Sequence, residues 1–339
     1  MLNPILLNFS TYQRSSKRRW FAVFVGVSLA VGCSSPALRV AEPSLTRFVI
    51  GVQAAKPIET RVAWLPLVQD IGKKNNLQIE LVTASQTDIV ASLRDGKIDV
   101  AWLSSNVAID AVIDAQAQAF ALYYNVNGTN GYKGVMLTRS DSGIDSLEQA
   151  LTKGKYTYAS GAKTSTSGYV LAQALIFSKA DTTAEQTFKS VGYGGHFPNL
   201  DLLWSKQVDV AVNNSTDLAV FQARVPEAKT GIRILWESPL VPNDVLMYRA
   251  NTPATHKAIL LSLFTNYAKT DPAEKDLFRK ASGISHFVAT DNKLLDPVTE
   301  FKFGAERAAV QGNSDLTEPE KALALARLNQ RLAAFKRML

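Results

Sequence analysis

The chain has 339 residues, of which 46% are hydrophobic and 20% are charged. This is an ordinary globular composition, long enough for two hydrophobic cores of about 100 to 200 residues each, and it excludes a mainly disordered protein. The single cysteine excludes an internal disulfide framework and a zinc site built from cysteine pairs. The formal net charge is +7, but no stripe of Lys and Arg with interleaved aromatic residues is present, so nucleic acid is not an expected partner.

The N-terminus has the pattern of an export signal. An apolar run of about a dozen residues, 20–31, is too short to span a hydrocarbon core of ~30 Å, and four basic residues precede it: Arg14, Lys17, Arg18 and Arg19. The pattern predicts a signal peptide over residues 1–32. Small residues precede Cys33, so we expect cleavage before this cysteine and attachment of lipid to it; an ordinary leader with an incidental cysteine is the alternative.

Removal of the leader changes the charge of the chain. The leader holds four of the 37 Lys and Arg residues and no acid, which leaves 33 basic against 30 acidic residues and a net charge of +3. A polar linker is expected at 33–46.

Strand and helix patterns then alternate along the chain. Short β-branched or continuous apolar runs predict strands at 47–52, 77–83 and 98–103, and helical spacing is present at 64–75 and 89–94. The nearly continuous apolar run at 98–103 is typical of a strand inside a parallel sheet. The rhythm therefore predicts an α/β fold.

The same alternation starts afresh between about 132 and 236, which predicts a second compact unit inserted into the first. Its expected strands are 135–138, 156–160, 192–194, 208–212 and 232–236, and its expected helices are 146–151, 168–177 and 200–206. From about 245 onward long helical patterns return, at 258–269 and in an apolar stripe from Leu323 to Phe335 that predicts a packing helix.

Motifs of common catalytic sites are missing from the sequence. It has no G-x-S-x-G elbow, no H-E-x-x-H and no G-x-G-x-x-G, and its three histidines are dispersed at 196, 256 and 286. The segment 161–165 (GAKTS) lacks the spacing of a phosphate-binding P-loop. We therefore expect no catalytic residues, no metal site and no cofactor.

The segment Ser165-Thr166-Ser167-Gly168 has the composition of an anion site. It follows a predicted strand and opens an apolar helix. A helix N-terminus offers unpaired N–H groups and about +0.5 of partial charge, and short hydroxyl side chains add donors, so such a terminus binds tetrahedral oxyanions without a buried cation. Glycine at 168 would let a ligand approach the backbone. Simple N-capping by one of these side chains is the alternative interpretation.

Several segments together resemble the substrate-binding proteins of phosphonate and phosphite ABC transporters, over about residues 48–339. They occur in the order of that family: Gly96–Trp102, Gly131-Tyr132, Ser165-Thr166-Ser167-Gly168, Gly195-His196, Val208–Ala211 with Asn213-Asn214, and Ser238–Asp244. The resemblance implies a class II periplasmic-binding-protein fold, in which two α/β lobes are joined by two chain crossings. Lobe 1 would comprise 47–133 and 242–339, and lobe 2 would comprise 134–241.

The resemblance also implies roles for individual residues. Ser165, Thr166 and Ser167 would hold the phosphoryl oxygens, Tyr132 would donate its hydroxyl from a crossing, and His196 would add a hydrogen bond. Without the resemblance, two alternatives remain. Tyr132 could simply pack at the hinge, and His196 could be an exposed loop residue.

Asp244 narrows the ligand class. A carboxylate facing an anion repels it unless the ligand carries an acidic hydrogen or an amine, although an aspartate after Pro242-Asn243 is also typical of a turn. Two departures from the family bear on the ligand. Thr216, followed by Asp217, stands where aminoalkylphosphonate binders have a glutamate for the amine, and Gln86 replaces a tyrosine of the first lobe. We expect phosphite or a small alkylphosphonate first, an aminoalkylphosphonate second and phosphate third.

The resemblance implies ligand-driven closure of the lobes without catalysis. The expected partners are an ABC permease with its ATPase, and the membrane through the lipid anchor. Two alternatives remain at this point. The chain could deliver its signal to a membrane receptor as a solute sensor, or it could be an enzyme for phosphorus esters that uses His196 and Asp244 as acid and base, although no nucleophile with an adjacent base is recognisable.

Overall fold

The computed structural model describes residues 46–54 and 56–339. The predicted signal peptide, Cys33 and almost all of the predicted linker lie outside the described residues. Within the described residues, no helix combines the length and apolar character that a membrane span requires.

A six-stranded mixed sheet has the order β13-β4-β12-β3-β1-β2. β1 pairs in parallel with β2 and β3, whereas β12 pairs antiparallel with β3 and β4, and β13 pairs antiparallel with β4. The strands are β1 (Arg47–Gln53), β2 (Gln78–Ala84), β3 (Val100–Leu103), β4 (Ala117–Asn125), β12 (Val245–Arg249) and β13 (Ile284–Ala289).

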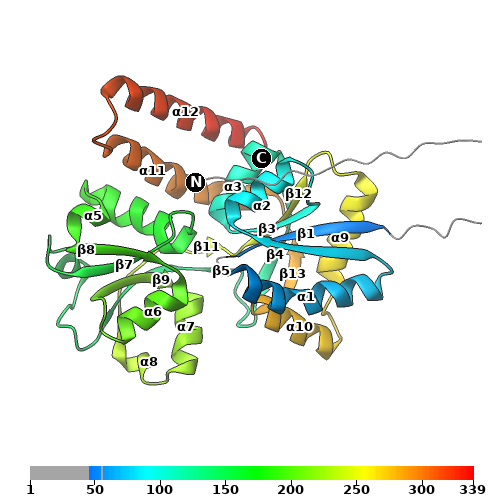
Figure 1. Cartoon of the computed structure of the whole chain (residues 1–339), viewed down its shortest axis with the longest axis horizontal. Coiled ribbons are helices and arrows are strands. Elements are labelled where there is room, and N and C mark those ends of the chain that lie inside the picture. Colours follow the sequence, from blue (N-terminus) through cyan, green and yellow to red (C-terminus); the bar gives the residue numbers. More distant parts are fainter. Residues whose placement is uncertain (1–45, 55) are drawn as a thin grey trace, which may run out of the picture. The chain divides into compact units, whose positions relative to one another are not determined.

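Helices cover both faces of this sheet (Figure 1). One face packs against α1 (Pro57–Lys74), α9 (Ala254–Asn266) and α10 (Pro272–Ser282). The other packs against α2 (Gln86–Arg94) and α3 (Ser105–Ala115), with the short η4 (Asn292–Leu295) beside them. Burial on both faces explains why strand 100–103 reads as a continuous apolar run.

A five-stranded sheet has the order β10-β6-β9-β7-β8. Its strands are β6 (Gly134–Arg139), β7 (Thr157–Gly161), β8 (Ser190–Gly194), β9 (Val210–Asn214) and β10 (Ile232–Glu237). Two hydrophobic clusters cover its faces. The helical segments are α4 (Leu147–Ala150), η1 (Thr166–Val170), η2 (Gln173–Phe177), η3 (Ser178–Ala180), α5 (Ala184–Thr187), α6 (His196–Trp204), α7 (Ser215–Arg224) and α8 (Ala228–Gly231).

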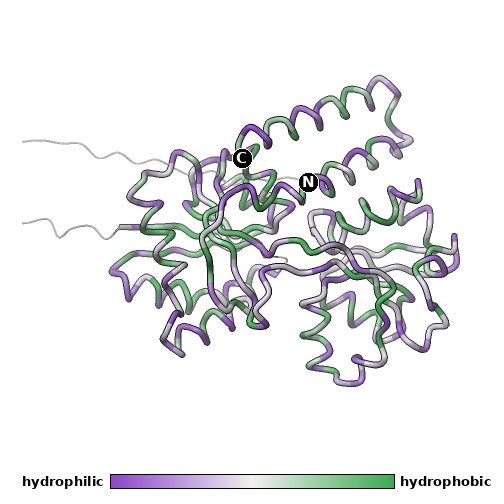
Figure 2. The backbone as a smooth tube through the Cα atoms, turned by 180° about the vertical axis from the view of Figure 1, so that it is seen from behind, coloured by the Kyte–Doolittle hydropathy of each residue, from purple (hydrophilic) through white to green (hydrophobic). Residues whose placement is uncertain are grey.

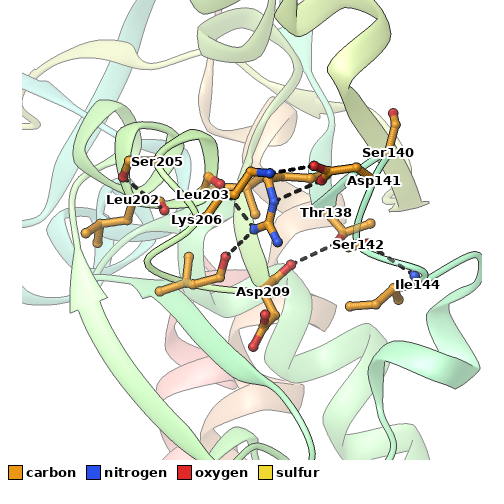
Figure 3. A network of polar contacts seen from close by, with 12 residues as sticks. Thr138, Ser140, Asp141, Ser142, Ile144, Leu202, Leu203, Ser205, Lys206 and Asp209 are labelled. Carbon is orange, nitrogen blue, oxygen red and sulfur yellow. Dashed lines mark hydrogen bonds and ion pairs between the residues drawn. The ribbon is translucent and has the colours of Figure 1, made fainter.

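A polar network stabilises one end of this second sheet (Figure 3). The Arg139 guanidinium donates to the backbone oxygen of Val208 at 2.9 Å and pairs with Asp141, which also pairs with Lys206 at 2.7 Å. The Thr138 hydroxyl donates to the backbone oxygen of Asp209 at 2.8 Å. These contacts hold the end of β6 against the turn between α6 and β9.

Two chain segments connect the sheets. β5 (Gly131–Tyr132) and β11 (Val241–Pro242) pair with each other as a two-stranded antiparallel ribbon. In sequence, each of these strands lies between a strand of the six-stranded sheet and a strand of the five-stranded sheet. The predicted lobe boundaries stay a prediction. The strands of the six-stranded sheet lie within 47–133 and 242–339, and those of the five-stranded sheet lie within 134–241.

A C-terminal helical pair lies beside both sheets (Figures 1 and 2). α11 (Asp296–Gln311) packs against α3, which covers the first sheet, and also against η1 and η2, which cover the second. α12 (Glu318–Lys336) packs against α11 and α3. The predicted packing of the Leu323–Phe335 stripe is confirmed at its C-terminal end, where Phe335 is fully buried. At its N-terminal end Leu323 is 54% exposed.

The helix after β7 differs from the expected α-helix. Both Tyr169 and Val170 donate their backbone N–H to the Ser165 oxygen, at 3.2 and 3.1 Å, so the first turn is widened into a π-helix. Hydrophobic periodicity does not distinguish a π-helix from an α-helix here, because over one turn both bury nearly the same side chains. π-turns of this kind are frequent at functional sites.

Candidate ligand-binding site

A cavity of about 1010 Å³ lies between elements of the two sheets. All nine side chains that the sequence singled out for the ligand site contribute to its lining: Gln86, Tyr132, Ser165, Thr166, Ser167, His196, Thr216, Asp217 and Asp244. They come from α2, the β5 crossing, the N-cap and first turn of η1, the starts of α6 and α7, and the segment before β12.

The turn at Ser165 is fixed by a close backbone approach. The Ser165 hydroxyl accepts the Gly168 N–H at 3.0 Å, so Ser165 is the N-cap. A Cβ on Gly161 would lie 2.5 Å from the Gly168 Cα, and a Cβ on Gly168 would lie 2.9 Å from the Gly161 Cα. The Gly168 N–H is therefore occupied, and the missing Cβ allows the close contact between β7 and η1. A role of Gly168 in the ligand's approach stays a prediction.

The N-termini of α3 and η1 meet at the cavity. α3 covers the six-stranded sheet, and η1 packs on the five-stranded sheet. The backbone N–H of Asn106, in the first turn of α3, donates to the Thr166 hydroxyl oxygen at 3.3 Å. Within the described residues, no acceptor pairs with the amides of Thr166 and Ser167. Unpaired first-turn amides and the positive ends of two helix dipoles create a local environment that favours an anion.

Tyr132 lies on β5, next to this pair of helix starts. Burial raises the pKa of its hydroxyl above the ordinary value, and the charge of Asp244 adds to the rise, while the hydroxyls of Thr166 and Ser105 oppose it. The phenol is therefore protonated over the physiological range. It can donate a hydrogen bond to an anion in the cavity.

His196 begins α6 and is not an exposed loop residue. Its Nε2 lies 3.4 Å from the Ser165 hydroxyl, and its Nδ1 lies 3.2 Å from Asn213 Oδ1 and 3.9 Å from Asp217 Oδ2. The backbone oxygen of His196 also accepts from Asn213 Nδ2 at 2.7 Å. Contacts on both ring nitrogens fix the imidazole beside the segment Ser165-Thr166-Ser167-Gly168, which we call the serine turn.

Asp244 is held by two donors that the sequence alone did not indicate. Gln53 Nε2 and Trp102 Nε1 both donate to Asp244 Oδ2, at 2.7 and 2.9 Å. Burial raises the pKa of the Asp244 carboxyl to about 6, with a further rise from the charge of Asp217, although the two donors oppose it. The carboxylate thus has a fixed position, so the interpretation of Asp244 as a plain turn residue is insufficient.

Further polar side chains extend this network. The Ser104 hydroxyl donates to Gln86 Oε1 at 2.8 Å, and the Ser104 N–H donates to Gln53 Oε1 at 3.1 Å. The Trp102 ring stacks on Tyr123 with centroids 5.0 Å apart. Gln53, Trp102, Ser104 and Tyr123 also line the cavity but were not predicted.

The charge of the lining is unusual for an anion site. Among its lining residues, Arg224 is the only Lys or Arg, whereas Asp217 and Asp244 are both present. The described residues contain no cluster of His, Cys, Asp and Glu suited to a metal ion. Hydroxyl, amide and imidazole groups therefore make up most of the polar lining, with one guanidinium among them.

Two helix-covered mixed sheets, a paired crossing ribbon and an intervening cavity define a two-lobed periplasmic binding protein. This confirms the predicted fold class. Residues 52–295 match the family model described as "ABC transporter, phosphonate, periplasmic substrate-binding protein". The chain belongs to this family, whose members bind a transported solute and are not enzymes.

Individual relatives agree with this assignment. Over 299 residues the chain is 30% identical to the phosphonates-binding periplasmic protein of Escherichia coli K12, covering 88% of this chain and 87% of that protein. A crystal structure of a phosphonate-transporter binding protein from Pseudomonas aeruginosa superposes with a TM-score of 0.72 at 28% identity, covering 86% of this chain and 97% of that one. A methylphosphonate complex from Prochlorococcus marinus, at 14% identity and a TM-score of 0.64 over 76% of this chain and 97% of that one, supports the fold alone.

Proposed function

We propose that this periplasmic binding protein holds phosphite or an alkylphosphonate in the cavity and delivers it to an ABC permease. Ser165, Thr166 and Ser167 receive the phosphoryl oxygens through hydroxyl and amide hydrogens. Tyr132 and His196 donate further hydrogen bonds. The observation that carries the proposal is the meeting of two helix starts at unpaired amides, because this arrangement favours a tetrahedral anion.

The order of ligand preference rests on the two carboxylates. Asp244 accepts a hydrogen from a protonated oxyanion such as monoanionic phosphite or alkylphosphonate, and it repels a fully deprotonated one. Thr216 stands where an aminoalkylphosphonate needs a carboxylate, which places that ligand second. Gln86 accepts a hydrogen bond from the Ser104 hydroxyl, and Ser104 is linked through Gln53 to Asp244. Phosphate is third.

We also propose that the mature protein begins at Cys33 and is held at the membrane by lipid. The basic and apolar leader pattern supports this. Metabolic labelling with a fatty acid should mark the wild type and not Cys33→Ser. Labelling of the variant, or none in the wild type, would exclude the anchor.

A thermal-shift panel tests the ligand. Phosphite, methylphosphonate, aminoethylphosphonate, hypophosphite and phosphate are compared, and one at about 100 times its dissociation constant adds about 2.7 kcal/mol to the free energy of unfolding. For a chain of this length that raises Tm by several degrees. No shift with any of the five would contradict the proposal.

Two variants test the site. Ser167→Ala should reduce the shift from the best ligand, because it removes a hydroxyl donor, while Ser205→Ala is the control. Ser205 is exposed at the C-terminal end of α6, and its hydroxyl donates to the backbone oxygen of Asp201. It is not part of the cavity lining. A full response in Ser167→Ala would remove the serine turn from the site.

A further inference from the structure

One face of α7 extends the cavity well beyond the serine turn. Ala219, Val220 and Ala223 all line the cavity, and their spacing of three and four residues places them on one side of the helix. We call these three residues the α7 strip. It begins one turn after Thr216, which also lines the cavity, so the strip is continuous with the start of α7.

The length of the strip suits a ligand substituent rather than a second ligand. At 1.5 Å per residue, the distance along α7 from Thr216 to Ala223 is roughly 10 Å. The lining also contains Val126, which is 61% exposed, and the C-terminal end of α10 with its cap, Gly283. The cavity of about 1010 Å³ is at the upper end of the range of about 300–1,000 Å³ found for drug-sized ligands.

The chemistry of the strip is apolar, with a cation at its outer end. Val220 is 37% exposed, so its burial by a ligand would remove apolar surface from water. Arg224 follows the strip, and its guanidinium lies 4.9 Å from the centroid of the Phe197 ring. A positive charge here disfavours a ligand that ends in an ammonium group.

We propose that the α7 strip is a subsite for the apolar substituent of an alkylphosphonate. The phosphonate group lies at the serine turn, and its alkyl chain runs outward along Ala219, Val220 and Ala223 toward Arg224. This inference rests on the proposed function and deepens it, because it selects alkylphosphonates with several carbons over phosphite and over aminoalkylphosphonates.

Calorimetric titration of the full chain with methyl-, ethyl-, propyl- and butylphosphonate tests the subsite. Each added methylene that is buried should tighten binding by about two- to fourfold. Equal affinity for methyl- and butylphosphonate would overturn the inference while leaving the phosphoryl site intact. If none of the four binds but phosphite does, the subsite fails and the phosphoryl site stands. If phosphite does not bind either, the proposed function fails and the subsite with it.

A matched pair of variants identifies the surface responsible. Val220→Ser should reduce the preference for butylphosphonate over methylphosphonate by threefold or more, with methylphosphonate affinity unchanged. Val82→Ser is the control, because Val82 is 36% exposed on β2 and is not part of the cavity lining. An equal loss for both ligands in Val220→Ser would mean that the strip is a contact for lobe closure and would overturn the subsite.

A second substitution guards against a general effect at position 220. Ala219→Gln places a neutral polar chain on the same face and should also flatten the dependence of affinity on chain length. Retention of the full dependence in both variants would exclude the strip as the binding surface.

Discussion

The close approach of Gly161 and Gly168 determines the geometry of the serine turn. Gly161→Ala should weaken phosphonate binding at least tenfold and lower the free energy of unfolding by about 1–3 kcal/mol, because the new Cβ would overlap backbone atoms that cannot yield. Its position is 2.5 Å from the Gly168 Cα. Titration calorimetry and urea unfolding measure the two effects.

Gly192→Ala is the matched control. Gly192 lies on the neighbouring strand β8, and a Cβ there would meet nothing within 4 Å. Normal binding by Gly161→Ala, or an equal loss in the control, would show that the close approach does not position the turn.

Asp244 makes stability depend on pH in an unusual direction. Its folded pKa is about 6, above the value of about 3.9 in an unfolded chain. Between these two values the folded state binds more protons, so the free energy of unfolding falls as pH rises from about 4 to about 6, by at most ~3 kcal/mol. Asp244→Asn should lack this fall.

Urea unfolding at several pH values between 4 and 7 tests this dependence. The difference in stability between Asp244→Asn and the wild type should grow with pH and become constant above pH 7. A constant difference across the whole range would contradict the raised pKa.

At the scale of residues, the sequence identified most of the polar side chains that line the cavity but not the donors that hold Asp244. Hydroxyl and imidazole side chains next to strand ends stand out in a sequence, and Tyr132, His196 and the serine turn all line the cavity. Gln53 and Trp102 do not stand out, because Gln53 ends an apolar strand and Trp102 lies within one. Only the neighbouring positions of β1, β3 and β12 in the sheet bring them to Asp244.

Among the elements, α11 depends on one buried ion cluster. The Lys302 side chain is 5% exposed and pairs with Asp110 of α3 at 2.8 Å and with Glu306 at 2.7 Å. Burial alone would lower the pKa of Lys302, but Asp110 and Glu306 raise it above the ordinary value. Arg331 of α12 adds a further contact to Asp110 at 2.8 Å.

Lys302→Ala should therefore destabilise the protein by about 3 kcal/mol, because it leaves partly buried carboxylates without their cation. Lys97→Ala should cost less than about 1 kcal/mol, since Lys97 is 72% exposed in its pair with Asp95. Urea unfolding of both variants measures the difference. Equal costs would mean that the cluster does not hold α11.

At this scale the sequence predicted where most elements lie but not how they pair or wind. Strands at 135–138 and 232–236 were expected, and their antiparallel pairing as β6 and β10 depends on tertiary contacts that local patterns do not report. The π-winding at Thr166 depends on the double acceptance by the Ser165 oxygen. No residue type specifies that geometry.

For the whole molecule, the restarted strand-helix rhythm was enough to predict a second α/β unit within the first. The bridging position of α11 was not predicted, because an amphipathic pattern gives the face that is buried and not the neighbour that buries it. Contacts to both α3 and η2 appear only in the folded chain.

Saturating phosphonate should shift the population toward a more closed form, since the cavity draws its lining from both sheets. Small-angle X-ray scattering of the wild type should show a smaller radius of gyration with methylphosphonate than without it. Ser167→Ala at the same ligand concentration should change less. An unchanged radius in a sample whose saturation is confirmed by calorimetry would contradict closure.

The contacts of α11 with helices of both sheets make the two edges of the cleft unequal. α11 packs against helices of both sheets, whereas residues of α7 and the C-terminal end of α10 line the cavity. We expect solute and displaced water to pass along α7 and the end of α10. Association rates should accordingly respond to substitutions along that route and be indifferent to those on α12. The solute is then expected to enter and leave at the same edge of the cleft.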